Sequence, residues 1–218
     1  MMRFSLLFRE IKVLHAQSAT TLQALGVYGV MLALFPFLLS AWPQVLNQAG
    51  PAFIWMMFLL MLLMTMPQLF LKDAEEGGID FLRTLPTSPL TILGIKGVAL
   101  GLMMGGPLLG LTLLLAPLYL LQNETLFYLI LTLGISLPLM ISLILFGAVM
   151  GASSQSTRGF FIVFLILPFT IPMVLLSLQV IEEGGFSGSF RLLLALILVM
   201  IPLSLAMASQ MMKDVFAR

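Results

Sequence analysis

The charged side chains of this 218-residue sequence are concentrated in one short segment. Of its ten Lys and Arg and nine Asp and Glu residues, seven lie between Lys72 and Lys96, in the stretch KDAEEGGIDFLRTLPTSPLTILGIK. Carboxylates and basic groups this close together can form ion pairs with a second protein, but they include no nucleophile beside a general base. The segment is therefore a candidate docking surface rather than a candidate active site.

Ligands for a metal or for haem iron are scarce in the chain. His15 is the single His, and its imidazole could ligate a metal or haem iron. No other donor clusters with it in sequence, so we favour a structural or interfacial role. The seventeen Met residues are scattered through apolar stretches, where Met is ordinary packing material, and there is no Cys to supply a thiolate. We expect no metal or cofactor to be held by this chain itself.

The chain also lacks the motifs of the common hydrolytic sites. It has neither the phosphate-binding pattern G-x-x-x-x-G-K-[ST] nor a G-x-S-x-G motif. The middles of its apolar stretches carry no charged residue, which disfavours an ion-coupled carrier, because intramembrane charges commonly mark an ion path. We expect a protein that is not an enzyme and that takes energy from a separate partner.

Composition identifies the class of protein that carries the polar segment. Hydrophobic residues make up 61% of the sequence and charged residues only 9%, far fewer than the roughly 25% of a soluble domain. We therefore predict an all-α integral membrane protein, with residues 1–218 forming a single transmembrane domain. Six membrane spans are expected, at residues 21–40, 52–71, 91–121, 126–150, 160–181 and 191–210.

The distribution of basic residues predicts which side of the membrane each loop faces. Turn formers between Ala41 and Pro51 indicate an outer loop there. With six spans, both termini lie on one side, and only Arg191 of the ten basic residues lies on the other. The nine that share the side of the termini are Arg3, Arg9, Lys12, Lys72, Arg83, Lys96, Arg158, Lys213 and Arg218. By the positive-inside rule this side is cytoplasmic, and so is the loop of residues 72–90.

Residues 1–18 are predicted to form an interfacial helix on the cytoplasmic side. Apolar residues recur there at spacings of three and four, which gives one apolar helical face. They are Phe4, Leu7, Phe8, Ile11 and Leu14. Two alternatives are a cleaved signal peptide and a tail that is merely adsorbed to the membrane.

The centre of the polar segment is predicted to form a short amphipathic helix. Gly77 and Gly78 interrupt the preceding span, and Pro86 stops a helix that covers Ile79 to Leu85. Within it, Asp80 near the N-terminus complements the helix dipole. The alternative is an ordinary solvated loop. The residues expected to contact a partner are Glu76, Gly77, Gly78, Ile79, Asp80, Phe81, Leu82, Arg83, Leu85 and Pro86.

Two further patterns concern the packing and bending of the spans. Gly97, Gly101 and Gly105 recur every four residues, which allows close approach of another helix, either within one subunit or between subunits. Pro168 and Pro172 flank Thr170, whose hydroxyl could satisfy a carbonyl freed by a proline. We expect the fifth span to be bent or locally unwound there.

The loop also resembles the first cytoplasmic loop of exporter-type (ABC-2-like) ABC permeases. The pattern E-x-G-x-[LI]-[DE]-x-L-x-x-[LT]-P, with a Lys near the head of the next span, is matched by Glu76, Gly78, Ile79, Asp80, Leu82, Leu85, Pro86 and Lys96, the first two being one residue out of register. Gly77 and Gly78 stand where that family often has glycine and a hydroxyl residue. The resemblance implies that this segment is a coupling helix, which transmits movements of an ATPase to the spans.

A narrower resemblance, to the heme exporter protein B family, extends over nearly the whole chain. In order along the chain, its landmarks are Leu34-Phe35-Pro36, Ile54-Trp55, the loop DAEEGGIDFLRTLPTSP, Arg158-Gly159, and LPFTIP at residues 167–172. Members are permease subunits of the bacterial ABC complex for cytochrome c maturation. The resemblance implies an inner-membrane protein with haem as the cargo of its complex and ATP bound by a partner subunit.

The same resemblance implies a set of partners. They are a cytoplasmic ABC ATPase, a second copy of this chain, a haem-handling membrane subunit, a small accessory membrane subunit and a periplasmic haem chaperone; no nucleic acid is expected. Two other functions remain open. One is export of a drug, lipid or glycan by a permease of the same architecture, and the other is a membrane scaffold that transports nothing.

Overall fold

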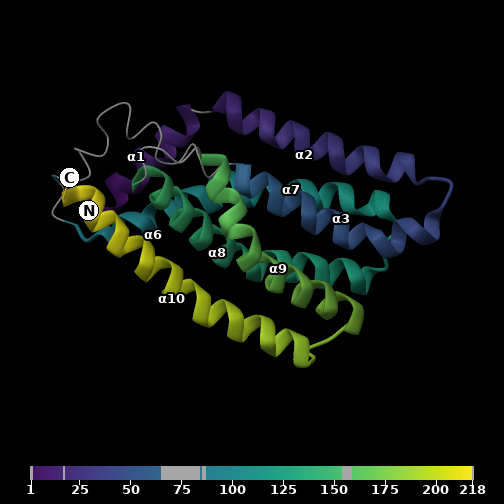
Figure 1. Ribbon diagram of the computed structural model, residues 1–218. Helices are drawn as coiled ribbons and strands as arrows, with labels where there is room; N and C mark the ends of the chain where they lie inside the picture. Colours follow the sequence, from purple (N-terminus) through teal and green to yellow (C-terminus); the bar gives the residue numbers. More distant parts are fainter. Residues whose placement is uncertain (1, 17, 65–83, 85–86, 154–158, 218) are drawn as a thin grey trace.

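The computed structural model describes residues 2–16, 18–64, 84, 87–153 and 159–217 (Figure 1). Within these ranges the regular structure is entirely helical. The elements are α1 (Met2–Ala16), α2 (Ser18–Leu38), α3 (Pro43–Met64), α6 (Pro89–Leu100), the π-helical segment η1 (Gly101–Gly105), α7 (Gly106–Leu115), the 3₁₀ segment η2 (Ala116–Tyr119), α8 (Asn123–Ser153), α9 (Gly159–Glu183) and α10 (Gly188–Ala217). Elements α6 to η2 form one continuous helical run.

The long helices lie side by side and alternate in direction (Figure 1). α1 and the C-terminal end of α10 lie at the same end of the bundle, together with the start of α6. The α2–α3 and α9–α10 connections lie at the opposite end. α6, the helix at the end of the polar segment, therefore begins at the same end of the bundle as the chain termini.

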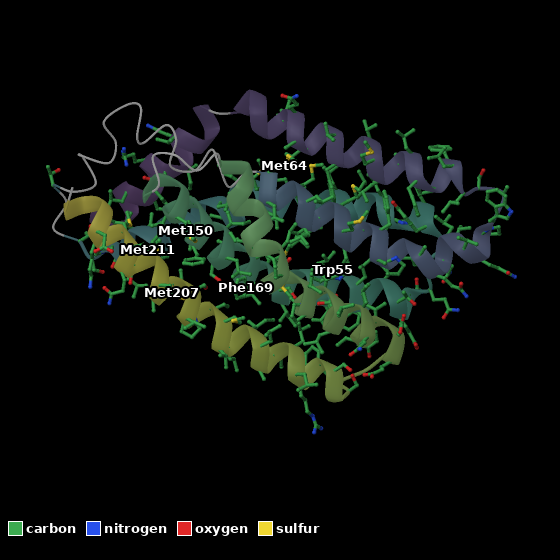
Figure 2. The ribbon with its side chains drawn as sticks, in the orientation of Figure 1. Trp55, Met64, Met150, Phe169, Met207 and Met211 are labelled. Carbon is green, nitrogen blue, oxygen red and sulfur yellow. The ribbon has the colours of Figure 1, made fainter. Side chains whose placement is uncertain are left out.

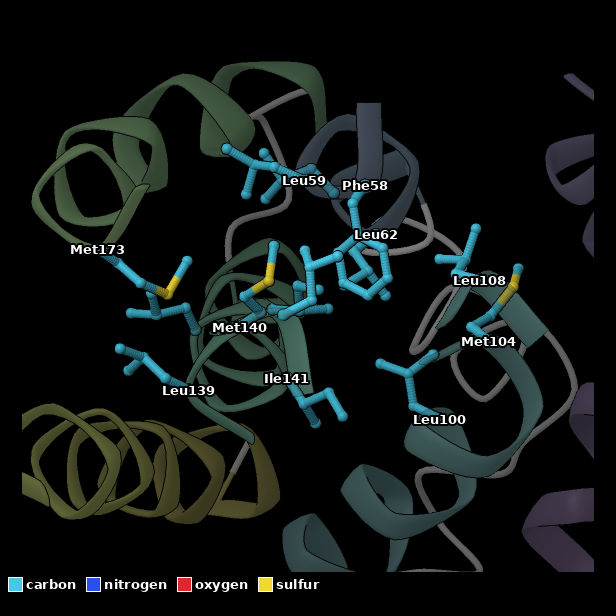
Figure 3. Packing of buried hydrophobic residues seen from close by; sticks show 14 of the residues in the cluster. Phe58, Leu59, Leu62, Leu100, Met104, Leu108, Leu139, Met140, Ile141 and Met173 are labelled. Carbon is cyan, nitrogen blue, oxygen red and sulfur yellow. The ribbon is translucent and has the colours of Figure 1, made fainter. Parts of the chain in front are cut away.

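α8 forms the centre of the bundle. It packs against α3, α6, α7, α9 and α10, and every residue from Leu139 to Leu145 is buried. A helix that is apolar on all sides is either enclosed by its neighbours or faces lipid, and this stretch of α8 is enclosed. Figure 3 shows Phe58 of α3 and Met173 of α9 directed toward Met140 of α8, and Met104 of η1 belongs to the same buried cluster. These methionines are packing residues of the core.

The helices are long and apolar enough for a multi-pass membrane protein. Within the described residues, the stretches that meet both criteria are Pro43–Met64, Pro89–Tyr119, Asn123–Gly151, Ile166–Glu183 and Gly188–Asp214. α2 adds a shorter apolar stretch, Leu22–Leu38. The all-α membrane class predicted from composition is thereby confirmed.

The predicted outer loop at residues 41–51 is wrong. α3 begins at Pro43, so the connection from α2 covers only Leu39 to Trp42. Pro43 opens the helix, where its missing N–H costs nothing. Pro51 lies inside α3, which a membrane helix tolerates when neighbouring groups satisfy its backbone. The residues taken for turn formers therefore belong to the first turns of a helix.

A tight contact explains why those turns are ordered. Asn47 Nδ2 donates to the Leu120 carbonyl at 2.8 Å. Leu120 has a left-handed backbone (φ 54°) and directly follows η2, where the helical run that starts with α6 ends. Gly50 lies beneath the ring of Tyr119, so close that an added Cβ would be 2.8 Å from Tyr119 Cδ1. The composition of this segment favours a turn, and these tertiary contacts stabilise it as a helix instead.

Two buried polar side chains inside the bundle form hydrogen bonds between helices. The Trp55 indole, which lies in the interior (Figure 2), donates to Thr132 Oγ1 at 3.4 Å and so links α3 to α8. Tyr119 Oη donates to the Leu32 carbonyl at 2.9 Å, which links η2 to α2. Such bonds satisfy polar groups where no water is present.

Candidate coupling site

The residues predicted to contact a partner all fall outside the described part of the chain. Glu76, Gly77, Gly78, Ile79, Asp80, Phe81, Leu82, Arg83, Leu85 and Pro86 all lie there. Between them, Thr84 is helical and exposed. The amphipathic helix at residues 79–85 therefore stays a prediction, and the structure describes what lies on either side of it.

The helix that follows the polar segment has a well-defined start. Ser88 is the N-cap of α6: its Oγ accepts a hydrogen bond from the Thr91 backbone N–H at 3.3 Å, and Pro89 occupies the first turn. The hydroxyls of Ser88 and Thr91 are 2.9 Å apart. An N-cap side chain satisfies a backbone donor that the helix leaves unpaired, which fixes the residue at which the helix begins. The last residues of the 72–90 loop are therefore joined directly to a capped, regular helix.

A buried ion pair joins α6 to the N-terminal helix. Lys96 Nζ donates to Glu10 Oε2 at 2.8 Å, and Arg9 Nη1 donates to the other carboxylate oxygen, Oε1, at 2.9 Å. Glu10 and Lys96 are each only 4% exposed. In the described part of the chain, they are the charged residues that are buried. Lys96 lies about 10 Å along α6 from its start, seven residues after Pro89.

The face of α1 that packs on the protein is not the apolar stripe seen in the sequence. Leu6 and Glu10 are buried, Leu7 and Ile11 are half-buried, and Phe8 is 65% exposed. The described residues of the apolar stripe therefore lie beside the contact with α6 or on the outer side of α1. A carboxylate occupies the inner face because Lys96 is there to pair with it.

Sequence reasoning did not find this ion pair. The available signals were an acid, Glu10, within an otherwise basic N-terminal helix, and a lysine, Lys96, inside an apolar stretch. Opposite charges in such settings call for partners. A single sequence does not show that residues 86 positions apart meet.

The three predicted packing glycines lie against α8 of the same chain. A Cβ on Gly97 would be 3.2 Å from Leu145 Cδ1, one on Gly101 would be 3.1 Å from Ile141 Cδ1, and one on Gly105 would be 2.8 Å from Leu137 Cδ2. Each glycine thus faces the side chain of one successive turn of α8. The π-helical segment η1 covers the last two of these contacts.

A hollow of about 470 Å³ opens beside Gly97 and Gly101, between α6, η1, α8 and α10. Its lining is almost wholly apolar, and Ser142 supplies the hydroxyl. That hydroxyl donates to the Leu139 carbonyl and accepts from Ser204 Oγ at 2.9 Å, so it is already bonded. The described lining offers no side chain that would ligate iron or pair with a carboxylate, and the hollow has no mark of a haem site.

The predicted kink residues lie in a helix that is continuous from Gly159 to Glu183. Figure 1 shows α9 changing direction along its length without a break, so local unwinding is not seen. Thr170 Oγ1 donates to the Leu167 carbonyl at 2.8 Å. The carbonyl that loses its partner to Pro172 is that of Pro168, four residues earlier. The Thr170 bond is therefore not the compensation expected from the sequence.

The other candidate ligand is in α1. His15 is part of this helix, and its side chain lies outside the described part of the structure. Among the described residues, no three His, Cys, Asp or Glu side chains lie close enough to hold a metal ion.

Comparison with known proteins identifies the family. A family model described as CcmB protein matches residues 1–213. The chain belongs to the CcmB family. Two curated relatives bear the name heme exporter protein B: that of Haemophilus influenzae is 28% identical over 203 residues, and that of Pseudomonas aeruginosa is 30% identical over 217. The matches cover 90% of both chains in the first case, and 93% of this chain and 94% of its relative in the second.

A third relative of this CcmB-family chain supports the same assignment. Heme exporter protein B of Bradyrhizobium diazoefficiens is 27% identical over 201 residues, which cover 89% of this chain and 90% of the relative. Because the likeness runs through the whole helical bundle, it includes the loop of residues 72–90, α1 and α6. The resemblance predicted from the sequence is confirmed.

Proposed function

We propose that this chain is the membrane permease subunit of an ATP-driven haem exporter that serves cytochrome c maturation. The likeness to heme exporter protein B over nine-tenths of both chains carries the proposal. A multi-pass helical bundle without a catalytic motif fits a permease, and ATP hydrolysis belongs to a separate cytoplasmic ATPase.

The proposal includes a topology and a coupling route. α2 completes a set of six spans in the bacterial inner membrane, and both termini are cytoplasmic, because nine of the ten basic residues share their side. The ATPase then acts on the segment from Glu76 to Pro86. The complex contains two copies of this chain with a haem-handling subunit and a small accessory subunit, and it delivers haem to, or releases, the periplasmic chaperone.

Complementation tests the function. A bacterium that lacks its own heme exporter protein B is given this chain, and covalent c-type cytochromes are measured by haem staining. Restored cytochromes support the proposal, provided that they disappear when the partner ATPase carries an inactivating substitution. The proposal would be contradicted if the chain is inserted in the membrane but c-type cytochromes are not restored. Resistance to a drug, or altered surface lipid or glycan, would then identify the alternative exporter.

A further inference from the structure

We propose that Glu10 and Lys96 are positioning residues that make α1 and the start of α6 a single moving unit. This inference rests on the proposed function in that an ATPase acts on the segment between α3 and α6. It adds that the N-terminal helix moves with α6 when that segment is displaced.

The burial of the pair is the first argument. Removing two charges from water is expensive, and apolar residues of similar size commonly give equal or greater stability. A pair kept at 4% exposure on both sides is therefore poorly explained by stability alone. Buried ionic pairs are best known for fixing register, because a partner displaced by one turn leaves both charges unpaired.

The geometry is the second argument. Glu10 bonds Lys96 of α6 through one carboxylate oxygen and its neighbour Arg9 on α1 through the other, so the orientation of its carboxylate is fixed. Leu6, one turn earlier on α1, is buried on the same face. α1 also contacts α2 and η1. The contact therefore fixes both the position of α1 on α6 and the rotation of α1 about its own axis.

The placement along the chain is the third argument. Ser88 caps α6 at the end of the loop, and Lys96 lies two turns further on. A displacement of the loop reaches Ser88 first and then the ion pair, through a regular helix whose proline, Pro89, lies in the first turn and interrupts no backbone hydrogen bond. Beyond Lys96, Gly97 is already in contact with α8. The pair thus lies at the point where α6 leaves the end of the bundle and enters its centre.

The experiment measures one distance within the assembled complex. The chain has no Cys, so Phe8→Cys on α1 and Leu90→Cys on α6, both at exposed positions, accept spin labels selectively. Pulsed electron resonance then gives the distance between labels without nucleotide and with ATP bound to a hydrolysis-deficient ATPase. A reference pair, Leu90→Cys and Phe127→Cys, spans the bundle to the outer end of α8.

When Glu10 and Lys96 are unaltered, we expect a narrow distribution of distances between the labels at positions 8 and 90, and we expect ATP to leave it unchanged. The distance between the reference labels at positions 90 and 127 should shift when ATP binds. In Glu10→Gln the narrow distribution between Phe8 and Leu90 is lost, whereas the matched control Lys213→Gln, which alters an exposed lysine of α10, keeps it. A distance between Phe8 and Leu90 that shifts with ATP would overturn the inference, and so would a narrow distribution retained in Glu10→Gln.

The two proposals fail in different ways. If the ATPase does not act on this chain, the reference distance stays constant, and the effect of Glu10→Gln still decides whether the ion pair fixes α1. If Glu10→Gln does not accumulate in the membrane, the unsubstituted pair measured in the two nucleotide states decides the inference by itself.

Discussion

The hydroxyls of Tyr28 and Thr112 lie 2.6 Å apart in the buried centre of the bundle and join α2 to α7. Thr112 Oγ1 donates its one proton to the Leu108 carbonyl at 2.8 Å, so Tyr28 is the donor to Thr112. This bond ties the shorter apolar helix to the rest of the bundle.

The direction of this bond predicts unequal effects of two substitutions. Thr112→Val leaves the Tyr28 hydroxyl buried without an acceptor and is expected to cost about 1–3 kcal/mol. Tyr28→Phe removes a donor from an oxygen that stays bonded to Leu108, so about 0.5–1.5 kcal/mol is expected. Chemical unfolding of the purified protein in detergent measures both. The interpretation fails if Tyr28→Phe is the more damaging change, or if the double variant is as unstable as Thr112→Val.

Gly105 gives a packing prediction with a control on the same helical run. Gly105→Ala places a methyl group 2.8 Å from Leu137 Cδ2 and 2.9 Å from Cδ1, and is expected to cost about 1–3 kcal/mol through overpacking. Gly110→Ala meets nothing within 4 Å and should stabilise the helix by up to about 1 kcal/mol. Thermal denaturation in detergent compares them. Adding Leu137→Ala to Gly105→Ala should recover part of the lost stability. Equal effects of Gly105→Ala and Gly110→Ala on stability would contradict this packing.

The predicted coupling helix is tested by its charges. Asp80→Lys combined with Arg83→Glu should abolish stimulation of the partner ATPase, because the charged groups expected to meet the partner are reversed. Membrane insertion should be unaffected. ATP hydrolysis by the co-purified complex is the measurement. The matched control is Glu182→Lys with Arg191→Glu, exposed charges at the opposite end of the bundle, which should hydrolyse ATP normally. Normal stimulation in the Asp80 and Arg83 variant would rule out the coupling role.

The prolines of α9 are tested in the same background. Replacing Pro168 and Pro172 by Ala restores two backbone donors and should straighten the helix. We expect less maturation of the haem chaperone with assembly retained. Haem bound covalently to the chaperone, relative to the amount of assembled complex, is the quantity to measure. Pro202→Ala in α10 is the control. Unchanged maturation in the double variant would show that the bend has no part in transport.

Composition and apolar run lengths were enough to predict the helical membrane class. Where the sequence misled, tertiary contacts decided the structure. Turn-forming residues from Pro43 to Pro51 read as a loop, but Asn47 is bonded to Leu120 and Gly50 lies beneath Tyr119, and both contacts come from a segment about 70 residues away. Local preference does not contain that information.

The same limit applies to the site. The third span was expected to begin at residue 91, whereas α6 begins at Pro89, because Ser88 is its N-cap and Pro89 is a first-turn proline. The apolar stripe of α1 predicted that helix but not its inner face. A repeat of apolar residues identifies Leu7 and Ile11, whereas the inner position of Glu10 depends on a lysine in the third span. Charge pairing across the fold had to be seen in three dimensions.

In the proposed function, this CcmB-family chain couples ATP hydrolysis to haem delivery through residues 72–90. The most direct measurement is covalent haem on the periplasmic chaperone in a strain whose own heme exporter protein B is replaced by this chain. We predict normal haem loading and release with the unaltered chain. With the Asp80 and Arg83 double substitution, we predict loss of chaperone maturation although the chain is inserted in the membrane. Equal chaperone maturation in the two strains would contradict the account.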